Sequence, residues 1–220
     1  MPELLPRKEF CKNTFFGYTK EIEYDASGNP VYASLHTEIE LQNKTLKNKI
    51  ALVEVFLTKN GSDEVILSRK QKMQVNPNTI DTAYVNLTLE TPLLWDVDTP
   101  NLYKLHARVT DLGVFKTHFV PSDFNTTDET SVLFGVKTVT ADNGKSVKLK
   151  GGCLHHDNGM LGAVSLYDAE YRKISMLKKI GFNAIRTTHN PPSAALMEVC
   201  DRLGMYVYDV AFDAWGIMKQ

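Results

Sequence analysis

The stretch FNAIRTTHNPPS, residues 182–193, changes character in its middle. Its first residues are apolar and strand-forming, whereas the residues from Arg186 to His189 form a polar cluster that two prolines soon follow. A short apolar run that ends at turn residues is typical of a buried strand. The sequence therefore predicts a strand over residues 182–186 that leads directly into a polar cluster with an imidazole.

This predicted strand is the middle one of an alternating series. The expected strands cover residues 147–150, 182–186 and 205–209, and the expected helices cover residues 165–180 and 193–203. Strands that alternate with helices in this way predict a parallel sheet with right-handed crossovers.

Local signals mark the ends and the buried faces of the two predicted helices. Ser165 and Asp168 have the spacing of a capping box, and Ser193 is a suitable N-cap for the second helix. Gly181 and Gly204 are suitable C-terminal stops. Apolar residues that recur at helical spacing predict the buried faces. They are Tyr167, Tyr171, Ile174 and Leu177 in the first helix, and Leu196, Val199, Cys200 and Leu203 in the second.

Polar side chains follow each of the three predicted strands. Because the carboxyl ends of parallel strands share one face, where ligands bind, we expect these side chains to converge. Imidazole, amide and carboxylate groups hydrogen-bond hydroxyls, and an indole face packs against the apolar patches of a sugar. The candidate sugar-binding residues are His155, Asp157, Arg186, His189, Asn190, Asp209 and Trp215.

Each candidate also has a plainer interpretation. Arg186 could anchor the strand end to a carboxylate, and the imidazole and carboxylate groups could hydrogen-bond their own loops. Trp215 could be a core residue. The adjacent His155 and His156 could bind a metal, but neighbours on an extended backbone point in opposite directions. We therefore expect neither a metal ion nor a cofactor.

The first part of the chain has the pattern of antiparallel strands. Strand-forming runs occur between residues 14 and 134, with Gly, Pro and Asn in the gaps. The clearest runs cover residues 31–41, 50–57, 84–89 and 104–109. Such runs predict an antiparallel β-sandwich. A chain of 220 residues, 43% of them hydrophobic, is long enough for one or two domains with buried cores.

The composition excludes several classes of function. The net charge is −1 and no basic stripe occurs, so we expect no binding to nucleic acid. No apolar run approaches the length of a membrane span, and residues 1–13 lack the apolar segment of a signal peptide. We therefore expect no membrane partner, and the compartment stays undetermined. The three cysteines include no Cys-x-x-Cys pair, which argues against zinc and redox sites, and Cys200 is predicted to be buried.

Several segments resemble glycoside hydrolase family 2, the family of the β-galactosidases and β-glucuronidases. The resemblance extends from about residue 15 to the end of the chain. Its motifs are LKG at 149–151 with His155 and Asp157, FNAIRTTHNP at 182–191, CDRLGMYVYD at 200–209, LWDVDTPNLY at 94–103 and FGVK at 134–137.

The resemblance implies a two-part chain. Residues 1–136 would form an all-β immunoglobulin-like sandwich, and residues 137–220 would form the N-terminal part of an incomplete (β/α)8 TIM barrel. Enzymes of this family retain the configuration of the sugar by means of two glutamates, and such a pair lies about 5 Å apart. In the family these glutamates come from later strands, one of them in an Asn-Glu pair that this sequence lacks.

We therefore expect a fragment of a glycoside hydrolase for β-linked sugars, of the β-galactosidase type, that is inactive alone. A carbohydrate is the expected substrate of the full-length parent, and the incomplete barrel would favour self-association. The sequence departs from the family at Leu154, His156, Thr188 and Val210, and Val210 stands in place of a glutamate. The alternative hypothesis is a non-catalytic carbohydrate-binding or assembly module built on the sandwich.

Overall fold

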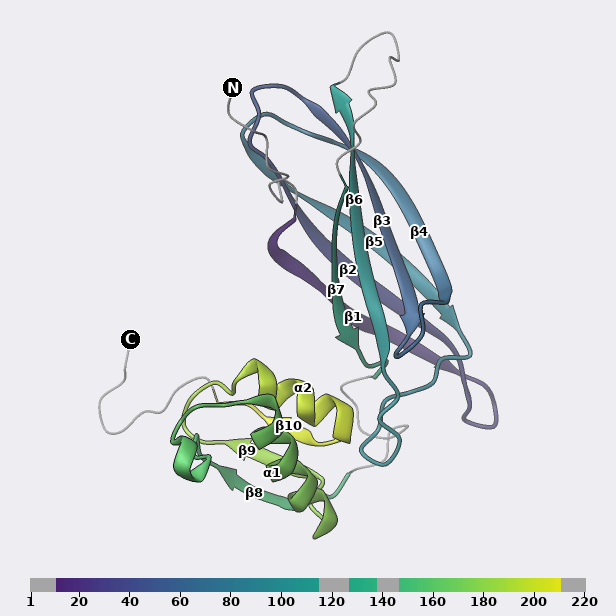
Figure 1. The fold of residues 1–220 in the computed structure, drawn as a ribbon. Coiled ribbons are helices and arrows are strands. Elements are labelled where there is room, and N and C mark those ends of the chain that lie inside the picture. Colours follow the sequence, from purple (N-terminus) through teal and green to yellow (C-terminus); the bar gives the residue numbers. More distant parts are fainter. Residues whose placement is uncertain (1–10, 115–126, 138–146, 211–220) are drawn as a thin grey trace, which may run out of the picture. The chain divides into compact units, whose positions relative to one another are not determined.

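The computed structural model describes residues 11–114, 127–137 and 147–210. The chain divides into two compact units (Figure 1). Unit 1 contains Met1–Leu93 and Tyr103–Thr138, and unit 2 contains Leu94–Leu102 and Val139–Gln220. The domain limits expected from the sequence, 1–136 and 137–220, stay a prediction.

Unit 1 is a sandwich of two antiparallel sheets, as predicted (Figure 1). One sheet has the strand order β1-β2-β5 and the other has the order β4-β3-β6-β7. The strands are β1 (Cys11–Tyr24), β2 (Pro30–Asn43), β3 (Lys49–Lys59), β4 (Val65–Val75), β5 (Thr79–Glu90), β6 (Tyr103–Val114) and β7 (Thr127–Phe134). Sheets of three and four strands are typical of an immunoglobulin-like sandwich.

The burial pattern of β2 shows why these residues form a strand. Ala33, Leu35 and Leu41 are at most 1% exposed, whereas the even-numbered residues of the strand face away from the core. A period of two places alternate side chains on opposite faces of a sheet. Thr37 is also on the inner face, and its hydroxyl donates to the Val85 carbonyl at 2.7 Å. The buried hydroxyl is therefore satisfied.

The described part of unit 2 contains parallel strands and helices in the predicted order. The sheet order is β10-β9-β8, and both pairs of neighbours are parallel. The elements are β8 (Gly151–Leu154), the 3-10 helix η2 (Gly159–Leu161), α1 (Tyr167–Lys179), β9 (Ala184–Thr187), α2 (Ala194–Leu203) and β10 (Tyr206–Tyr208). This is the start of a β/α barrel pattern. Among the described residues, no helix is long and apolar enough to cross a membrane.

The core of unit 2 is formed by the helices, β9 and the residue that directly precedes β10. Its buried members are Ile174, Ile185, Leu196, Val199, Cys200 and Met205. Cys200 is 1% exposed, as predicted, and burial raises the pKa of its thiol to about 12. The thiol is therefore protonated at neutral pH and acts as a packing group.

The first strand of unit 2 lies later in the sequence than predicted. The four residues before Gly151 form no strand. Instead, the Asn183 side chain binds them, donating to the Lys148 carbonyl at 3.0 Å and accepting from the Lys150 amide at 2.7 Å. At Gly151 a Cβ atom would lie 1.9 Å from the Ala184 carbonyl oxygen. This close approach requires glycine, which strand propensity disfavours, and the prediction missed the strand for that reason.

Both ends of α2 are as predicted. The Ser193 hydroxyl accepts a hydrogen bond from the Leu196 amide at 3.0 Å, and Gly204 ends the helix with a φ of +72°. Gly181 follows α1 with a φ of +93°. The amides of Gly181 and Phe182 donate to carbonyls in the last turn of α1, which satisfies the helix end.

The start and the buried face of α1 differ from the prediction. No side-chain cap precedes the helix, and the Ser165 hydroxyl instead donates to the Glu170 carboxylate at 2.6 Å. Tyr167 and Tyr171 are 38% and 45% exposed, and their rings stack on each other at 6.2 Å. The buried residues of α1 are Glu170 and Ile174. The Ser165 hydroxyl contacts both Glu170 and the distant Ser193, and the spacing of a capping box does not reveal these contacts.

The segment Leu94–Leu102 packs within unit 2 although it follows β5 in the sequence. The Trp95 indole N–H donates to the Asp201 carbonyl at 2.8 Å. The Lys178 ammonium donates to the Val97 carbonyl at 2.6 Å. These contacts join residues far apart in the sequence, so local patterns could not predict them.

We expect Gly151→Ala to lower the free energy of unfolding by about 2–3 kcal/mol, because the new methyl group overlaps the β9 backbone. Gly152→Ala is the matched control, since the nearest atom to its Cβ would be 3.8 Å away, on Phe182. Urea denaturation followed by tryptophan fluorescence measures both. Equal stability of the two variants would contradict the role given to Gly151.

Candidate functional site

The three parallel strands end at the same edge of their sheet. In the strand register, Arg186 lies between Cys153 and Tyr208, and Leu154 pairs with Thr187. The segments that follow therefore leave the sheet at the edge where β/α folds bind ligands. The described candidates on these segments are His155, Asp157, Arg186, His189, Asn190 and Asp209. Trp215 lies outside the described residues.

His155 and His189 come together from neighbouring strand ends. Their ring centroids are 5.5 Å apart, and the rings meet edge to face at 75°. His155 is exposed and His189 is half-buried, so neither imidazole is enclosed by the described residues. The peptide bond between Thr188 and His189 is cis. A neutral imidazole carries one donor and one acceptor nitrogen, which suits it to hydroxyl groups.

The guanidinium of Arg186 lies beside the thiol of Cys153 on the neighbouring strand. Its Nη1 donates to Sγ at 3.6 Å. Hydrogen bonds from Arg186 and from Thr188 lower the pKa of the Cys153 thiol. The contact holds the Arg186 guanidinium at the strand end, where it can donate a hydrogen bond to a ligand oxygen.

Asp209 has a local partner on the neighbouring strand. Thr187 is 1% exposed, and its hydroxyl lies 3.4 Å from both the Asp209 carboxylate and the Tyr208 carbonyl. The same hydroxyl accepts from the Val210 amide at 3.1 Å. Asp209 thus contacts a hydroxyl on the neighbouring strand and not its own loop, and the residue remains exposed. Its role in sugar binding stays a prediction.

Asp157 and His156 both stabilise the segment after β8. The Asp157 carboxylate accepts from the Gly159 amide at 2.8 Å, and Nε2 of His156 lies 3.1 Å from the Pro191 carbonyl. Asn190 is exposed. Within the ranges that the structure describes, no group of three histidine, cysteine or acidic side chains could hold a metal ion. Sugar binding by Asp157 and Asn190 stays a prediction.

Glu170 supports this site and was not among the predicted residues. It is 3% exposed, and its carboxylate accepts from Ser165 Oγ at 2.6 Å and from Asn158 Nδ2 at 2.9 Å. Lys173 Nζ lies 3.0 Å from the other carboxylate oxygen. Burial raises the pKa of Glu170, but the hydrogen bonds and Lys173 outweigh it and hold the pKa below its ordinary value. The carboxylate is therefore buried and ionised at neutral pH.

This buried charge connects two segments at the carboxyl edge of the sheet. The Ser165 hydroxyl that donates to Glu170 also lies 2.6 Å from the hydroxyl of Ser193, the N-cap of α2. The segment between β8 and α1 is thereby tied to the start of α2. A signal was present in the sequence, because Glu170 lies four residues before Ile174, on the apolar face of the helix. A charge at such a position needs partners.

Both parts of the chain match a known family. Residues 137–218 match "Glycosyl hydrolases family 2, TIM barrel domain", and residues 19–137 match "Glycosyl hydrolases family 2". The chain belongs to glycosyl hydrolase family 2. The resemblance seen in the sequence is confirmed, as is the fold class of a sandwich followed by part of a TIM barrel.

The curated relatives in this family are much longer than the chain. "Beta-galactosidase BoGH2A" of Bacteroides ovatus is 38% identical over 140 residues, which cover 60% of this chain and 15% of that protein. A β-galactosidase of Halalkalibacterium halodurans is 26% identical over 192 residues, which cover 87% of this chain and 18% of that protein. The chain thus spans less than a fifth of either relative.

Solved structures share the fold of this chain. A family 2 member from Bacteroides cellulosilyticus superposes with a TM-score of 0.76 at 33% identity, covering 94% of this chain and 25% of that one. Bacteroides uniformis β-glucuronidase has a TM-score of 0.71 at 21% identity, covering 90% of this chain and 23% of that one. The second likeness concerns the fold alone.

We expect Glu170→Gln to destabilise the chain at neutral pH by about 1–3 kcal/mol, because an amide cannot replace the buried carboxylate. The folded state lowers the pKa of Glu170 below its ordinary value of 4.5. Its contribution is therefore complete above that value and is lost as the pH falls through the lowered pKa. Urea denaturation at several pH values should show the two proteins converging in acid.

Asp168→Asn provides the matched control, since Asp168 is an exposed acid in the same helical turn. It should change the free energy of unfolding by less than about 0.5 kcal/mol. A constant difference between the wild type and Glu170→Gln at all pH values would contradict the buried-charge explanation.

Proposed function

We propose that the full-length protein containing this chain hydrolyses β-linked sugars, with β-galactosides as the first substrate class. Membership of family 2 supports a carbohydrate substrate. The observation that carries the proposal is the proximity of His155 and His189 at the carboxyl ends of parallel strands, with Arg186 in register beside Cys153. The choice of galactosides rests on the relative from Bacteroides ovatus, which is named a β-galactosidase.

In this proposal the strand-end residues bind the sugar and do not cleave the glycosidic bond. The imidazoles of His155 and His189 would exchange hydrogen bonds with sugar hydroxyls, and the Arg186 guanidinium would donate to ligand oxygens. The subsite would be completed by Asp157, Asn190, Asp209 and Trp215.

The proposal assigns the bond-breaking carboxylates to other parts of the parent protein. A retaining glycosidase uses two carboxyl groups about 5 Å apart, one as nucleophile and one as acid and base. At this edge Asp157 accepts a backbone hydrogen bond and Asp209 contacts a threonine hydroxyl. Both carboxylates have structural partners, so neither is proposed as the nucleophile. The 220-residue chain alone is therefore expected to be inactive.

Nitrophenyl β-galactoside and nitrophenyl β-glucuronide test this assignment. The purified 220-residue chain should release no nitrophenol above the buffer rate, and the full-length protein should hydrolyse the galactoside faster than the glucuronide. Clear turnover by the short chain would contradict the assignment of the carboxylates. Faster turnover of the glucuronide would change the substrate class.

His189→Ala in the full-length protein tests the binding role of the strand ends. We expect kcat/KM to fall about 10- to 100-fold, because hydrogen bonds to the sugar are lost. Arg172→Ala, an exposed position on α1, is the control and should leave kcat/KM unchanged. Equal kcat/KM values for the two variants would refute the role of His189.

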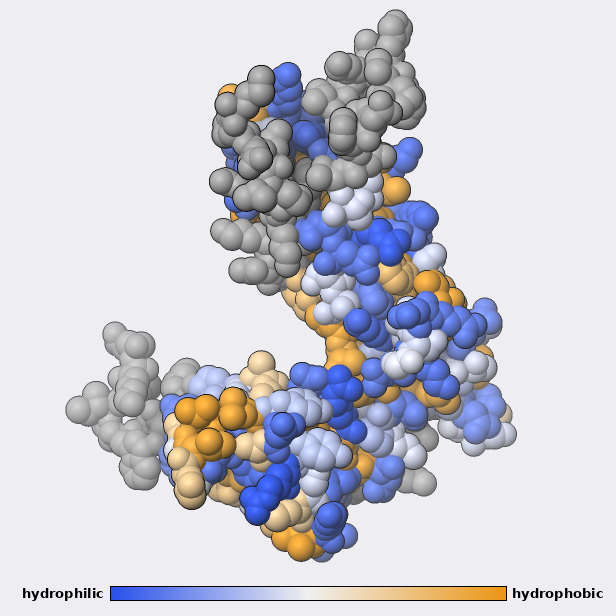
Figure 2. Space-filling view, in the orientation of Figure 1, coloured by the Kyte–Doolittle hydropathy of each residue, from blue (hydrophilic) through white to orange (hydrophobic). Residues whose placement is uncertain are grey.

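We also propose that the 220-residue chain self-associates through unit 2. Among the described residues, β8 and β10 each pair only with β9, so no strand lies along the outer side of either. Leu149, Ile180 and Tyr208 are 60%, 71% and 65% exposed. Figure 2 shows hydrophobic surface gathered on this unit. Unpaired edges and exposed apolar side chains both favour association.

Light scattering should give a mass that rises above the monomer value of 24.8 kDa as the concentration increases. Tyr208→Lys should reduce this association, because a lysine on an edge strand opposes pairing with a second copy. A monomer at every concentration would contradict the proposal.

A further inference from the structure

The outer face of the sheet β1-β2-β5 carries side chains in rows that the strand register defines. Even-numbered side chains of β2 point away from the core, and each lies between a residue of β1 and a residue of β5. Three successive rows are Tyr18-His36-Asn86, Glu21-Ser34-Thr88 and Glu23-Tyr32-Glu90. The middle row has short side chains on two of its strands, and the rows beside it carry rings.

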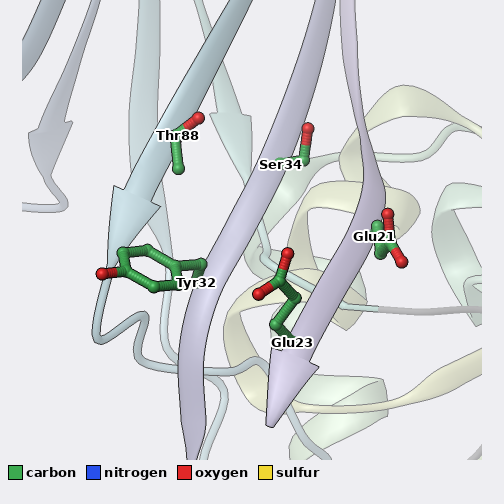
Figure 3. Close-up of a pocket in the computed structure, with 5 residues that line it drawn as sticks. All are labelled: Glu21, Glu23, Tyr32, Ser34 and Thr88. Atoms are coloured by element: carbon green, nitrogen blue, oxygen red, sulfur yellow. The ribbon is translucent and has the colours of Figure 1, made fainter.

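The short side chains leave a trough on the surface of this sheet. It has a volume of about 380 Å³ and is lined by Glu21, Glu23, Tyr32, Ser34 and Thr88 (Figure 3). Figure 3 shows the Tyr32 ring reaching towards β5 and the Glu23 carboxylate turned towards Ser34. The volume lies within the range of small-molecule sites, about 300–1,000 Å³.

An ordered group of rings lies next to the trough. The ring of His36 is 5.1 Å from that of Tyr18 and 5.8 Å from that of Tyr84. Nδ1 of His36 also lies 2.6 Å from Oδ1 of Asn86, which fixes the imidazole. Tyr18 and Tyr32 are 45% and 40% exposed, so part of each ring is open to solvent. Exposed aromatic groups of this kind indicate a binding surface.

We propose that this trough is a binding site for a neutral oligosaccharide, separate from the strand-end site of unit 2. The rings of Tyr18 and Tyr32 offer apolar faces with partial negative charge, which suit the C–H groups of a sugar ring. The carboxylates of Glu21 and Glu23 accept hydrogen bonds from hydroxyls, and Ser34 can donate or accept. Three strands about 4.8 Å apart span about 10 Å, the length of a disaccharide.

The charge of the lining determines the class of ligand. Its five residues include two carboxylates and no basic group, so a uronic or sulfated sugar would be repelled. An apolar protein segment placed here would bury these carboxylates without partners, which costs free energy. A neutral ligand rich in hydroxyls satisfies them, and for that reason the proposal commits to a sugar.

Cellobiose, a neutral β-linked disaccharide, tests the site in the 220-residue chain. Titration followed by two-dimensional NMR should shift backbone amides of β1, β2 and β5, with a Kd of about 1–10 mM. Cellobiouronic acid, which carries one carboxylate, should bind at least about tenfold more weakly. The proposal is overturned by an absence of shifts, or by shifts confined to the residues that follow β8, β9 and β10.

Two outward-facing positions allow the trough to be changed without altering the core. Tyr32→Ala should weaken cellobiose binding about tenfold, and Ser34→Val should abolish binding by filling the trough. Tyr171→Ala is the matched control, because it removes a tyrosine of similar exposure, 45%, from α1 of unit 2. It should bind cellobiose like the wild type. Thermal unfolding checks that each variant is folded, and a folded Ser34→Val decides the question if Tyr32→Ala is unfolded.

Unchanged binding by a folded Ser34→Val would overturn the proposal, as would equal weakening by Tyr32→Ala and Tyr171→Ala. The outcome is independent of the proposed hydrolysis. The trough belongs to unit 1, and hydrolysis of nitrophenyl glycosides by the full-length protein is a separate measurement.

Discussion

No side chain fits between β8 and β9 at Gly151, and the geometry of unit 2 depends on this close contact. A Cβ atom there would lie 1.9 Å from the Ala184 carbonyl oxygen. Because the two backbones meet at this point, Leu154 is placed opposite Thr187 at the far end of the pair. The next residues then bring the His155 and His189 rings to 5.5 Å from each other. The position of the candidate site thus follows from the absence of one methyl group.

A buried charge supports the segments that carry this site. Glu170 accepts hydrogen bonds from Ser165 and Asn158, and Ser165 also contacts the N-cap hydroxyl of α2. A buried carboxylate with incomplete partners would be costly, so the partners and the charge must form together. The strand register sets where the chain leaves the sheet, and this network holds two of the segments that follow. Binding groups need such support if they are to keep one geometry.

The sequence predicted those features of the fold that depend on local patterns. The alternation in β2, the Ser193 cap and the parallel order of three strands follow from spacing alone. The predictions failed where contacts outside the local pattern decide. The Ser165 hydroxyl does not cap its helix but donates to Glu170 and contacts Ser193, and β8 begins at a glycine that the adjacent β9 backbone requires. For the site, the order of strands predicted that the polar side chains converge. It could not predict their individual partners, such as Thr187 for Asp209.

The packing of Leu94–Leu102 within unit 2 has a consequence for the synthesis of the chain. Trp95 precedes its partner Asp201 by 106 residues, so the indole leaves the ribosome long before α2 exists. At about 5–20 residues per second, the two are separated by about 5–20 s of translation. Unit 2 therefore cannot be completed until Leu94–Leu102, which is synthesised early, packs against the later segment Val139–Gln220. A gene that started at the barrel segment would encode unit 2 without residues Leu94–Leu102.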